Sequence, residues 1–438
     1  MTMFLRGAAV GALVLALAGC IGSGKPKTPV VGTRTSILAT EAGALADPTI
    51  AQVPVTLPGA LVNEVWAQPG GNASKSMGHL ALGAAPARLW SVKIKGSTQR
   101  AKLAAAPVVA DGRVYLADTD AVVTAYAADT GAVIWSTALH EDKNNRASRF
   151  GGGASFADSQ VYATSGLGDV VALNAADGKQ VWKVKPGGPL RGAPTIANGI
   201  VYVLSQDNQL YALSQTSGAV QWTQSGSLES QGVFGVAAPA SAQGTVVAGF
   251  SSGELNAYRY ENGRLLWQDT LSRTSVSTSV SALSDIDADP VIDGGRAYAI
   301  GQGGRLVALE LATGQRLWEQ NFASISTPWL ASEWLFVVTD DARLICVARA
   351  SGKVRWISQL KRYDNVKKRK GPIQWTGPVL AGDRLLLLNS KGQIVSASPA
   401  DGSVTTTMKG SGKFDLPPVV ANSTLYVVSD DGRLSAYR

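Results

Sequence analysis

Short apolar runs separated by turn residues fill most of this chain. Between Pro290 and Trp318, four such runs are separated by Gly, Asp or Asn at every reversal. Runs of this kind are typical of strands joined in a meander. No segment after residue 86 keeps a helical period over about eleven residues. The pattern therefore predicts an all-β domain.

The same unit recurs along the chain and is marked by a glycine followed four positions later by a tryptophan. The first copy is Gly131 with Trp135, and the last, Gly402 with Thr406, keeps the glycine and loses the tryptophan. Successive marker glycines are 38 to 51 residues apart. Four short strands repeated at this period predict a β-propeller blade. The intermediate copies are Gly178 with Trp182, Gly218 with Trp222, Gly263 with Trp267, Gly314 with Trp318 and Gly352 with Trp356.

Both marker residues have an expected physical role. Glycine suits a hairpin position with positive φ, where other residues meet a steric penalty. The tryptophan should lie on the outer strand and cover the apolar gap between neighbouring blades, because one blade cannot bury both faces of its own sheet. A tryptophan cage for a ligand is the alternative, but evenly repeated aromatic residues favour packing.

The number of blades follows from their first strands, most of which begin with a proline before an apolar pair. The last unit reaches Arg438 without a fourth strand, whereas an orphan strand with Leu89 and Trp90 precedes the first complete unit. We therefore predict an all-β, eight-bladed β-propeller of four-stranded antiparallel blades over residues 87–438, closed by the N-terminal strand. The predicted starts are Pro107, Gly153, Pro194, Pro239, Pro290, Pro328, Pro378 and Pro418.

The N-terminal residues resemble a bacterial lipoprotein signal. The apolar stretch before residue 20 is too short to span a bilayer, and it ends in Leu17-Ala18-Gly19-Cys20, which is similar to a lipobox. The resemblance implies a signal peptide over residues 1–19, diacylation of Cys20 and, with Ile21 next, an outer-membrane anchor facing the periplasm. An ordinary signal peptide with a chance cysteine is the alternative.

Two further segments precede the predicted propeller. Residues 20–60 are rich in Gly, Pro, Thr and Ala, which predicts a lipidated flexible tether. Residues 61–86 are more mixed and are expected to be an irregular lead-in whose structure the pattern does not specify. Cys346, the only other cysteine, aligns with small residues of the third strands, so we expect a core residue and no intrachain disulfide.

The net charge of +8 is unevenly distributed. Six cations and a single opposing Asp364 occupy the connection between Trp356 and Pro378. This loop could meet an acidic partner, lipid headgroups or lipopolysaccharide; a solvated loop is the alternative. An exported lipoprotein is not expected to bind nucleic acid. The six cations are Lys361, Arg362, Lys367, Lys368, Arg369 and Lys370.

Catalytic and metal-binding patterns are hard to find. His79 and His140 belong to no cluster, nucleophile elbow or zinc-protease motif. The aspartates from Asp285 onward resemble a calcium loop, but Pro290 and Arg296 stand where that loop needs glycine and glutamate. We therefore expect no enzyme activity and no metal.

The repeat resembles the tryptophan-docking repeat of quinoprotein dehydrogenases, which are also eight-bladed. Those enzymes hold pyrroloquinoline quinone under adjacent cysteines and beside calcium, and this chain has no adjacent cysteines. We therefore expect no cofactor. A periplasmic quinoprotein-type dehydrogenase is the alternative function.

The whole chain is more similar to the BamB family, the lipoprotein propellers of the outer-membrane β-barrel assembly machinery. The local match is Leu283-Ser284-Asp285-Ile286-Asp287, which resembles the connection between blades four and five in that family. The resemblance implies that this loop contacts the periplasmic domains of the barrel subunit. Leu228 corresponds to a neighbouring contact loop, although that loop's arginine has no counterpart here. Turn formation is the alternative role for the aspartates.

The resemblance predicts a function without catalysis. The chain would be a scaffold lipoprotein of the outer-membrane assembly complex that binds the barrel subunit and assists insertion of outer-membrane proteins. It could also hold nascent outer-membrane proteins by strand addition at an exposed blade edge.

Overall fold

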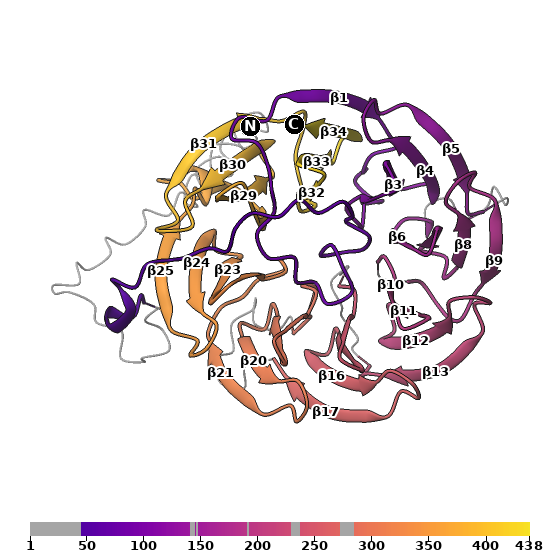
Figure 1. Cartoon of the computed structure of the whole chain (residues 1–438), viewed down its shortest axis with the longest axis horizontal. Helices are drawn as coiled ribbons and strands as arrows, with labels where there is room; N and C mark the ends of the chain where they lie inside the picture. Colours follow the sequence, from indigo (N-terminus) through magenta and orange to yellow (C-terminus); the bar gives the residue numbers. More distant parts are fainter. Residues whose placement is uncertain (1–44, 141–144, 146–147, 191, 229–236, 272–283) are drawn as a thin grey trace, which may run out of the picture. The chain divides into compact units, whose positions relative to one another are not determined.

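The apolar runs form four-stranded antiparallel sheets around one axis (Figure 1). The computed structural model describes residues 45–140, 145, 148–190, 192–228, 237–271 and 284–438. The predicted residues Cys20 and Leu283 therefore lie outside the described part. That part contains the short 3-10 turn η2 (Pro48–Ile50), and no helix there has the length and apolarity needed to cross a membrane.

In blades 1 to 4 the strands pair in chain order, and the fourth strand lies on the outside of the ring (Figure 1). Blade 1 contains β2 (Val108–Ala110), β3 (Arg113–Ala117), β4 (Val122–Ala127) and β5 (Val133–Ala138). Blade 2 contains β6 (Ala154–Ala157), β7 (Gln160–Thr164), β8 (Val170–Asn174) and β9 (Gln180–Val184). Blade 3 contains β10 (Thr195–Ala197), β11 (Ile200–Leu204), β12 (Gln209–Ser214) and β13 (Val220–Ser225). Blade 4 contains β14 (Ala240–Ala242), β15 (Thr245–Gly249), β16 (Glu254–Arg259) and β17 (Leu265–Thr270).

Blades 5 to 8 complete the ring, with one extra hairpin between blades 6 and 7. Blade 5 contains β18 (Val291–Asp293), β19 (Arg296–Ile300), β20 (Leu306–Glu310) and β21 (Arg316–Gln320). Blade 6 contains β22 (Trp329–Ala331), β23 (Trp334–Val338), β24 (Arg343–Ala348) and β25 (Val354–Gln359), and the hairpin is β26 (Tyr363–Asn365) with β27 (Lys370–Pro372). Blade 7 contains β28 (Trp375–Ala381), β29 (Arg384–Asn389), β30 (Gln393–Ala397) and β31 (Val404–Lys409). Blade 8 contains β32 (Val419–Ala421), β33 (Thr424–Ser429), β34 (Arg433–Tyr437) and β1 (Arg88–Lys93).

The N-terminal strand closes the ring, as the sequence predicts. β1 pairs antiparallel with β34, and Trp90 lies opposite Ala436. In Figure 1 the indigo strand β1 therefore follows the yellow strand β34 in one sheet. Reciprocal backbone hydrogen bonds between Ala87 and Arg438, at 2.7 and 2.9 Å, extend this pairing to the end of the chain. The eight-bladed, N-terminally closed fold is confirmed.

Each marker tryptophan packs on the marker glycine of the next blade. At the boundary between blades 4 and 5, the Trp267 indole N–H donates to the Leu311 carbonyl at 2.7 Å. A Cβ placed on Gly314, whose φ is +74°, would lie 2.5 Å from the Trp267 ring. The ring can therefore cover the apolar gap only because the neighbouring turn has no side chain. The docked pairs among the described residues are Trp90 with Gly131, Trp135 with Gly178, Trp182 with Gly218, Trp222 with Gly263, Trp267 with Gly314, Trp318 with Gly352 and Trp356 with Gly402.

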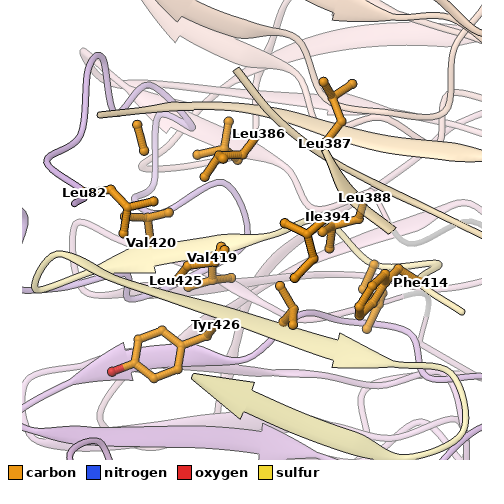
Figure 2. Packing of buried hydrophobic residues seen from close by; sticks show 14 of the residues in the cluster. Leu82, Leu386, Leu387, Leu388, Ile394, Phe414, Val419, Val420, Leu425 and Tyr426 are labelled. Carbon is orange, nitrogen blue, oxygen red and sulfur yellow. The ribbon is translucent and has the colours of Figure 1, made fainter. Parts of the chain in front are cut away.

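The boundary between blades 7 and 8 is built differently, and the position facing it holds Thr406. Blade 8 has no turn between its third and fourth strands, because β34 ends the chain and β1 comes from the other end. No marker glycine is therefore available in this blade for a ring to dock on. Leu82 lies among the side chains of blades 7 and 8 instead (Figure 2). The packed residues labelled there are Leu82, Leu386, Leu387, Leu388, Ile394, Phe414, Val419, Val420, Leu425 and Tyr426.

Cys346 occupies the third-strand position that faces the docked tryptophan. It lies opposite Trp356 across β24 and β25, as Ala257 lies opposite Trp267 in blade 4. The side chain is fully buried, and burial raises the pKa of its thiol. The prediction of a small core residue is confirmed.

The lead-in residues 61–83, which we call the axial segment, cross the middle of the ring (Figure 1). They hydrogen-bond to the first strand, or the residue after it, in each blade of the described chain. Trp66, for example, exchanges two backbone hydrogen bonds with Val109, both 2.8 Å long. The axial segment therefore ties all the blades together at the axis. The contacts in blade order are Trp66 with Val109, Ala67 with Phe156, Gln68 with Ile196, Ala73 with Ser241, Ser74 with Ile292, Gly78 with Trp329, Leu80 with Leu380, and Asn63 with Asn422.

Candidate partner-binding site

The two predicted contact loops leave the propeller on neighbouring blades. Leu228 follows β13 of blade 3, and its side chain is 79% exposed. Ser284 belongs to the connection from blade 4 to blade 5, and its hydroxyl donates to the Ser251 carbonyl at 3.1 Å. Isolated exposed leucines are common on protein surfaces, so its exposure alone does not identify a site. Whether Leu228 belongs to a binding site therefore depends on the hydrogen bonds that hold the residues around it.

Asn208 joins the two loops through one side chain. Its amide Nδ2 donates to the Ser227 carbonyl at 2.7 Å, and its Oδ1 accepts from the Ser251 backbone N–H at 3.1 Å. Ser251 in turn accepts from Ser284, so Leu228 and Ser284 are connected through a short hydrogen-bonded path. The described residues at the edges of the two predicted loops, Ser227 and Ser284, are therefore linked through Asn208 and Ser251.

Glu254 of blade 4 also holds the region around Ser227 and Ser251, which we call the corner between blades 3 and 4. Its carboxylate accepts from the Ser227 backbone N–H and hydroxyl, both at 2.7 Å. Burial acts to raise the pKa of Glu254, but hydrogen bonds from Ser227, Ser252 and Gln268 lower it below its ordinary value. The carboxylate thus stays ionised and keeps the residue before Leu228 in place. Sequence reasoning missed Asn208 and Glu254, because they lie in ordinary turn and strand-start positions.

Asp285 and Asp287 lie inside the propeller. Their residues are 1% and 6% exposed, and the Gln302 backbone N–H donates to the Asp285 carbonyl at 3.0 Å. Ile286 between them is fully buried, and its N–H donates to the Phe250 carbonyl. The two aspartates are therefore buried parts of the connection between blades 4 and 5 and do not form its exposed surface. Their predicted contact with a partner stays a prediction, and Leu228 is the exposed member among the described residues of the predicted set.

An axial cavity of about 250 Å³ lies beside these aspartates. The axial segment contributes Trp66, which stacks on Trp329 of blade 6 with ring centroids 6.1 Å apart. The cavity has a mainly apolar, aromatic lining, which suits a ligand of that character. The described residues contain no group of three or more His, Cys, Asp or Glu side chains that could hold a metal ion. The lining includes Trp66, Lys75, Asp287, Asp289, Gln302, Trp329, Trp375 and Phe414.

A buried charge pair lies at the edge of this cavity. The Lys75 ammonium donates to the Thr195 hydroxyl at 3.0 Å, and the Asp289 carboxylate accepts from the Ala238 backbone N–H at 2.6 Å. Burial lowers the pKa of Lys75 to about 8, and the charge of Asp289 opposes this shift. Burial likewise raises the pKa of Asp289, while Lys75 acts to lower it. The two buried charges thus act on each other electrostatically, while each side chain hydrogen-bonds to a different blade, Lys75 to Thr195 and Asp289 to Ala238.

Neither histidine forms part of a nucleophilic arrangement in the described chain. His79 is buried in the axial segment, where its Nε2 accepts from the Asp383 backbone N–H at 3.0 Å and its Nδ1 contacts the Pro58 carbonyl at 2.7 Å. His140 Nδ1 lies 3.1 Å from the Asp169 carboxylate, and burial lowers the pKa of His140. No described hydroxyl or thiol donates to either imidazole, so both histidines have structural contacts.

The predicted basic loop lies elsewhere on the ring, between blades 6 and 7. Its cations are exposed and belong to the hairpin β26–β27 and the residues just before it. The structure therefore does not bring the basic loop together with Leu228, which lies between blades 3 and 4.

Comparison with known proteins agrees with this fold. The family described as outer membrane protein assembly factor BamB matches residues 77–148, 119–358 and 360–438. The BamB proteins of Yersinia pestis and Escherichia coli K12 are each 29% identical to this chain. The first alignment covers 80% of this chain and 88% of the relative, and the second covers 79% and 87%.

Solved structures show the same architecture at lower sequence identity. BamB from Moraxella catarrhalis has a TM-score of 0.64 and 17% identity, covering 81% of this chain and 100% of that one. The quinohemoprotein alcohol dehydrogenase of Comamonas testosteroni has a TM-score of 0.67 and 14% identity, covering 86% and 81%. Both likenesses concern the fold alone. The family match over most of the propeller decides between the two resemblances, and the chain belongs to the BamB family of outer membrane protein assembly factors.

Proposed function

We propose that this protein is a non-catalytic scaffold of outer-membrane protein assembly. The observation that carries the proposal is the family match, which spans nearly all of residues 77–438. Relatives from several bacteria bear the name outer membrane protein assembly factor BamB, and the alignments include most of their length.

The proposed location is the periplasmic face of the outer membrane. The sequence Leu17-Ala18-Gly19-Cys20 supports lipid attachment at Cys20. A Cys20→Ser variant exported on a conventionally cleaved signal peptide should therefore be released from the membrane pellet by a high-salt wash, because one or two acyl chains supply most of such an attachment. Retention equal to that of the parent after the wash would contradict lipid attachment at this residue.

The proposed partner is the barrel subunit of the assembly complex, bound through its periplasmic domains at the corner between blades 3 and 4. Leu228 supports this choice, because it is exposed and follows Ser227, which Asn208 and Glu254 hold by hydrogen bonds. A backbone that is already ordered loses less conformational freedom on binding. In this proposal Asp285 and Asp287 act indirectly, by shaping the connection beside Ser284, and Leu283 belongs to the same loop.

Nascent outer-membrane proteins are a second proposed partner, bound by strand addition. The fourth strand of each described blade has a neighbour on one side only. Among these strands, β31 has four consecutive exposed residues and no marker tryptophan. Such an edge offers unpaired backbone groups to an extended peptide. The quinoprotein alternative has weaker support, since those structures share only 14% identity with this chain.

A co-purification experiment tests the main partner. Leu228→Ala should reduce recovery of the barrel subunit from solubilised membranes roughly tenfold, as expected when an interface loses a central anchor. Leu61→Ala is the matched control, because Leu61 is also an exposed leucine, at 72%, and lies on the axial segment. Equal recovery with both variants would remove Leu228 from the interface.

A further inference from the structure

The basic loop is an ordered hairpin fixed at its root. Tyr363 pairs with Pro372 and Asn365 with Lys370 across β26 and β27. The Ile373 N–H donates to the Arg362 carbonyl at 2.9 Å, and the Trp375 indole N–H donates to the Lys361 carbonyl at 3.0 Å. The described junctions between the other blades carry no comparable hairpin. Its cations therefore project from a defined place on the ring.

Nearly the whole net charge of the chain gathers here. Lys391 and Lys409 of blade 7 line one cleft together with Lys361 of the loop, and the other five loop cations follow in the adjoining hairpin segment. Residues 361–373, 391–393 and 407–409 contain eight Lys and Arg side chains and one acid, Asp364, so their net charge is +7 in a chain of +8. Asp364 is paired with Lys391 at 2.6 Å. The remaining cations have no salt bridge to a described residue, so their positive charges can interact with an anionic ligand.

The cleft has the chemical character of a headgroup site. Lys361, Lys391 and Lys409 come from three separate segments and line the same cleft of about 460 Å³. Ile373 and Met408, which are buried and partly buried, supply an apolar part of its wall. Cations around an apolar wall complement a phosphate that carries glycerol and acyl carbons.

The N-terminal chain contacts the strand that precedes the hairpin, and this favours a membrane surface as the ligand of the cleft. Near the start of the described chain, the Asp47 N–H donates to the Val354 carbonyl at 2.7 Å, and Arg355 donates to the Val53 carbonyl at 2.7 Å. Both contacts lie on β25, the strand that leads into the hairpin. Twenty-four residues lie between Cys20 and Leu45, so the two are at most roughly 90 Å apart when this chain is fully extended. A lipid on Cys20 would therefore limit the distance between the membrane and β25.

We propose that the hairpin and its cleft bind anionic phospholipid headgroups, so that blades 6 and 7 face the membrane. This inference rests on the proposed lipid attachment, which supplies proximity, while the patch supplies orientation. Leu228 lies three blade junctions away along the ring. The two irregular connections would then serve two different partners, the membrane and the barrel subunit.

Vesicle binding tests the proposal without the lipid anchor. The mature chain, residues 20–438 with Cys20→Ser, should bind vesicles of phosphatidylglycerol and phosphatidylcholine, bind vesicles of phosphatidylcholine alone weakly, and dissociate as salt is raised. Adding K367Q, K368Q, R369Q and K370Q should weaken binding roughly tenfold or more. The control carries K93Q, R100Q, K185Q and R264Q, which remove the same charge from exposed positions elsewhere, and it should bind like the parent.

Three outcomes would overturn the proposal. The parent could bind both vesicles equally, the two quadruple variants could weaken equally, or the hairpin could bind polyglutamate while ignoring the vesicles, which would assign it to an acidic protein. Recovery of the barrel subunit with the hairpin variant separates this inference from the proposed function. If the hairpin variant loses vesicle binding but recovers the barrel subunit normally, the hairpin binds lipid and is not part of the partner site. If Leu228→Ala loses recovery of the barrel subunit but binds vesicles normally, Leu228 belongs to the partner site alone.

Discussion

Seven boundaries between blades are sealed by a tryptophan docked on a glycine, and the boundary between blades 7 and 8 is sealed by aliphatic packing. At a docked boundary, one ring both fills the gap and donates a hydrogen bond to a turn carbonyl of the next blade, as Trp267 does to Leu311. At the exceptional boundary no ring is docked, and apolar side chains of both blades, with Leu82 from the axial segment, belong to one buried cluster (Figure 2).

The difference shows that tryptophan is kept where the next blade offers a turn to receive it. Thr406 follows Gly402 at the marker spacing, but blade 8 replaces that turn with the two ends of the chain. The loss of tryptophan at this one position thus has a geometric cause. The closing strand β1 agrees with this explanation. The next blade, blade 1, has a complete turn, and Trp90 docks on its glycine, Gly131.

The strongest test removes a docked ring. Trp267→Ala should lower the free energy of unfolding by about 3 to 5 kcal/mol, because it deletes a buried aromatic side chain and leaves a cavity. Thermal melting followed by circular dichroism would show this as a lower Tm. A change no larger than that of an exposed substitution would mean that docking does not seal the boundary.

A smaller effect separates the docking contact from backbone strain. Gly314→Ala and Gly199→Ala both place alanine at φ +74°, where a Cβ costs about 1 to 2 kcal/mol. A Cβ on Gly314 would also meet Trp267 at 2.5 Å, whereas one on Gly199 meets nothing within 4 Å. Gly314→Ala should therefore cost about 1 to 3 kcal/mol more than Gly199→Ala in denaturant unfolding. Equal costs would show that the glycine serves the turn alone.

The axial segment adds a pH-dependent contribution that the docked boundaries lack. The pKa of Lys75 is lowered to about 8 in the folded protein, so between about pH 8 and 10.5 the unfolded chain binds more protons and stability rises with pH. The stability of the parent relative to Lys75→Met should therefore increase by about 2 kcal/mol from pH 7 to about 9.5. Urea unfolding of both proteins at the two pH values measures it, and a constant difference would mean that Lys75 titrates normally.

The sequence predicts the ring well because the ring is periodic. The spacing of Gly and Trp indicates the blades, and the unmatched Trp90 indicates how they close. The axial segment could not be predicted, because it contacts blade edges mainly through its backbone, which leaves no side-chain period to read. The burial of Asp285 and Asp287 escaped prediction for a related reason: a turn sequence does not say whether its side chains face solvent or the axis.

The smallest expected effect concerns Thr406, and it tests most directly whether the missing turn of blade 8 explains the missing tryptophan. Thr406 is exposed and pairs with Ser396 at the position where other blades carry the docked ring, so Thr406→Ala should change stability by no more than about 0.5 kcal/mol. Thr406→Trp restores the repeat in sequence but faces no glycine turn in blade 8, so it should also leave Tm nearly unchanged. A rise of several degrees in Thr406→Trp would show that tryptophan can seal this boundary without a receiving turn. The absence of the turn would then no longer explain why the ring is missing there.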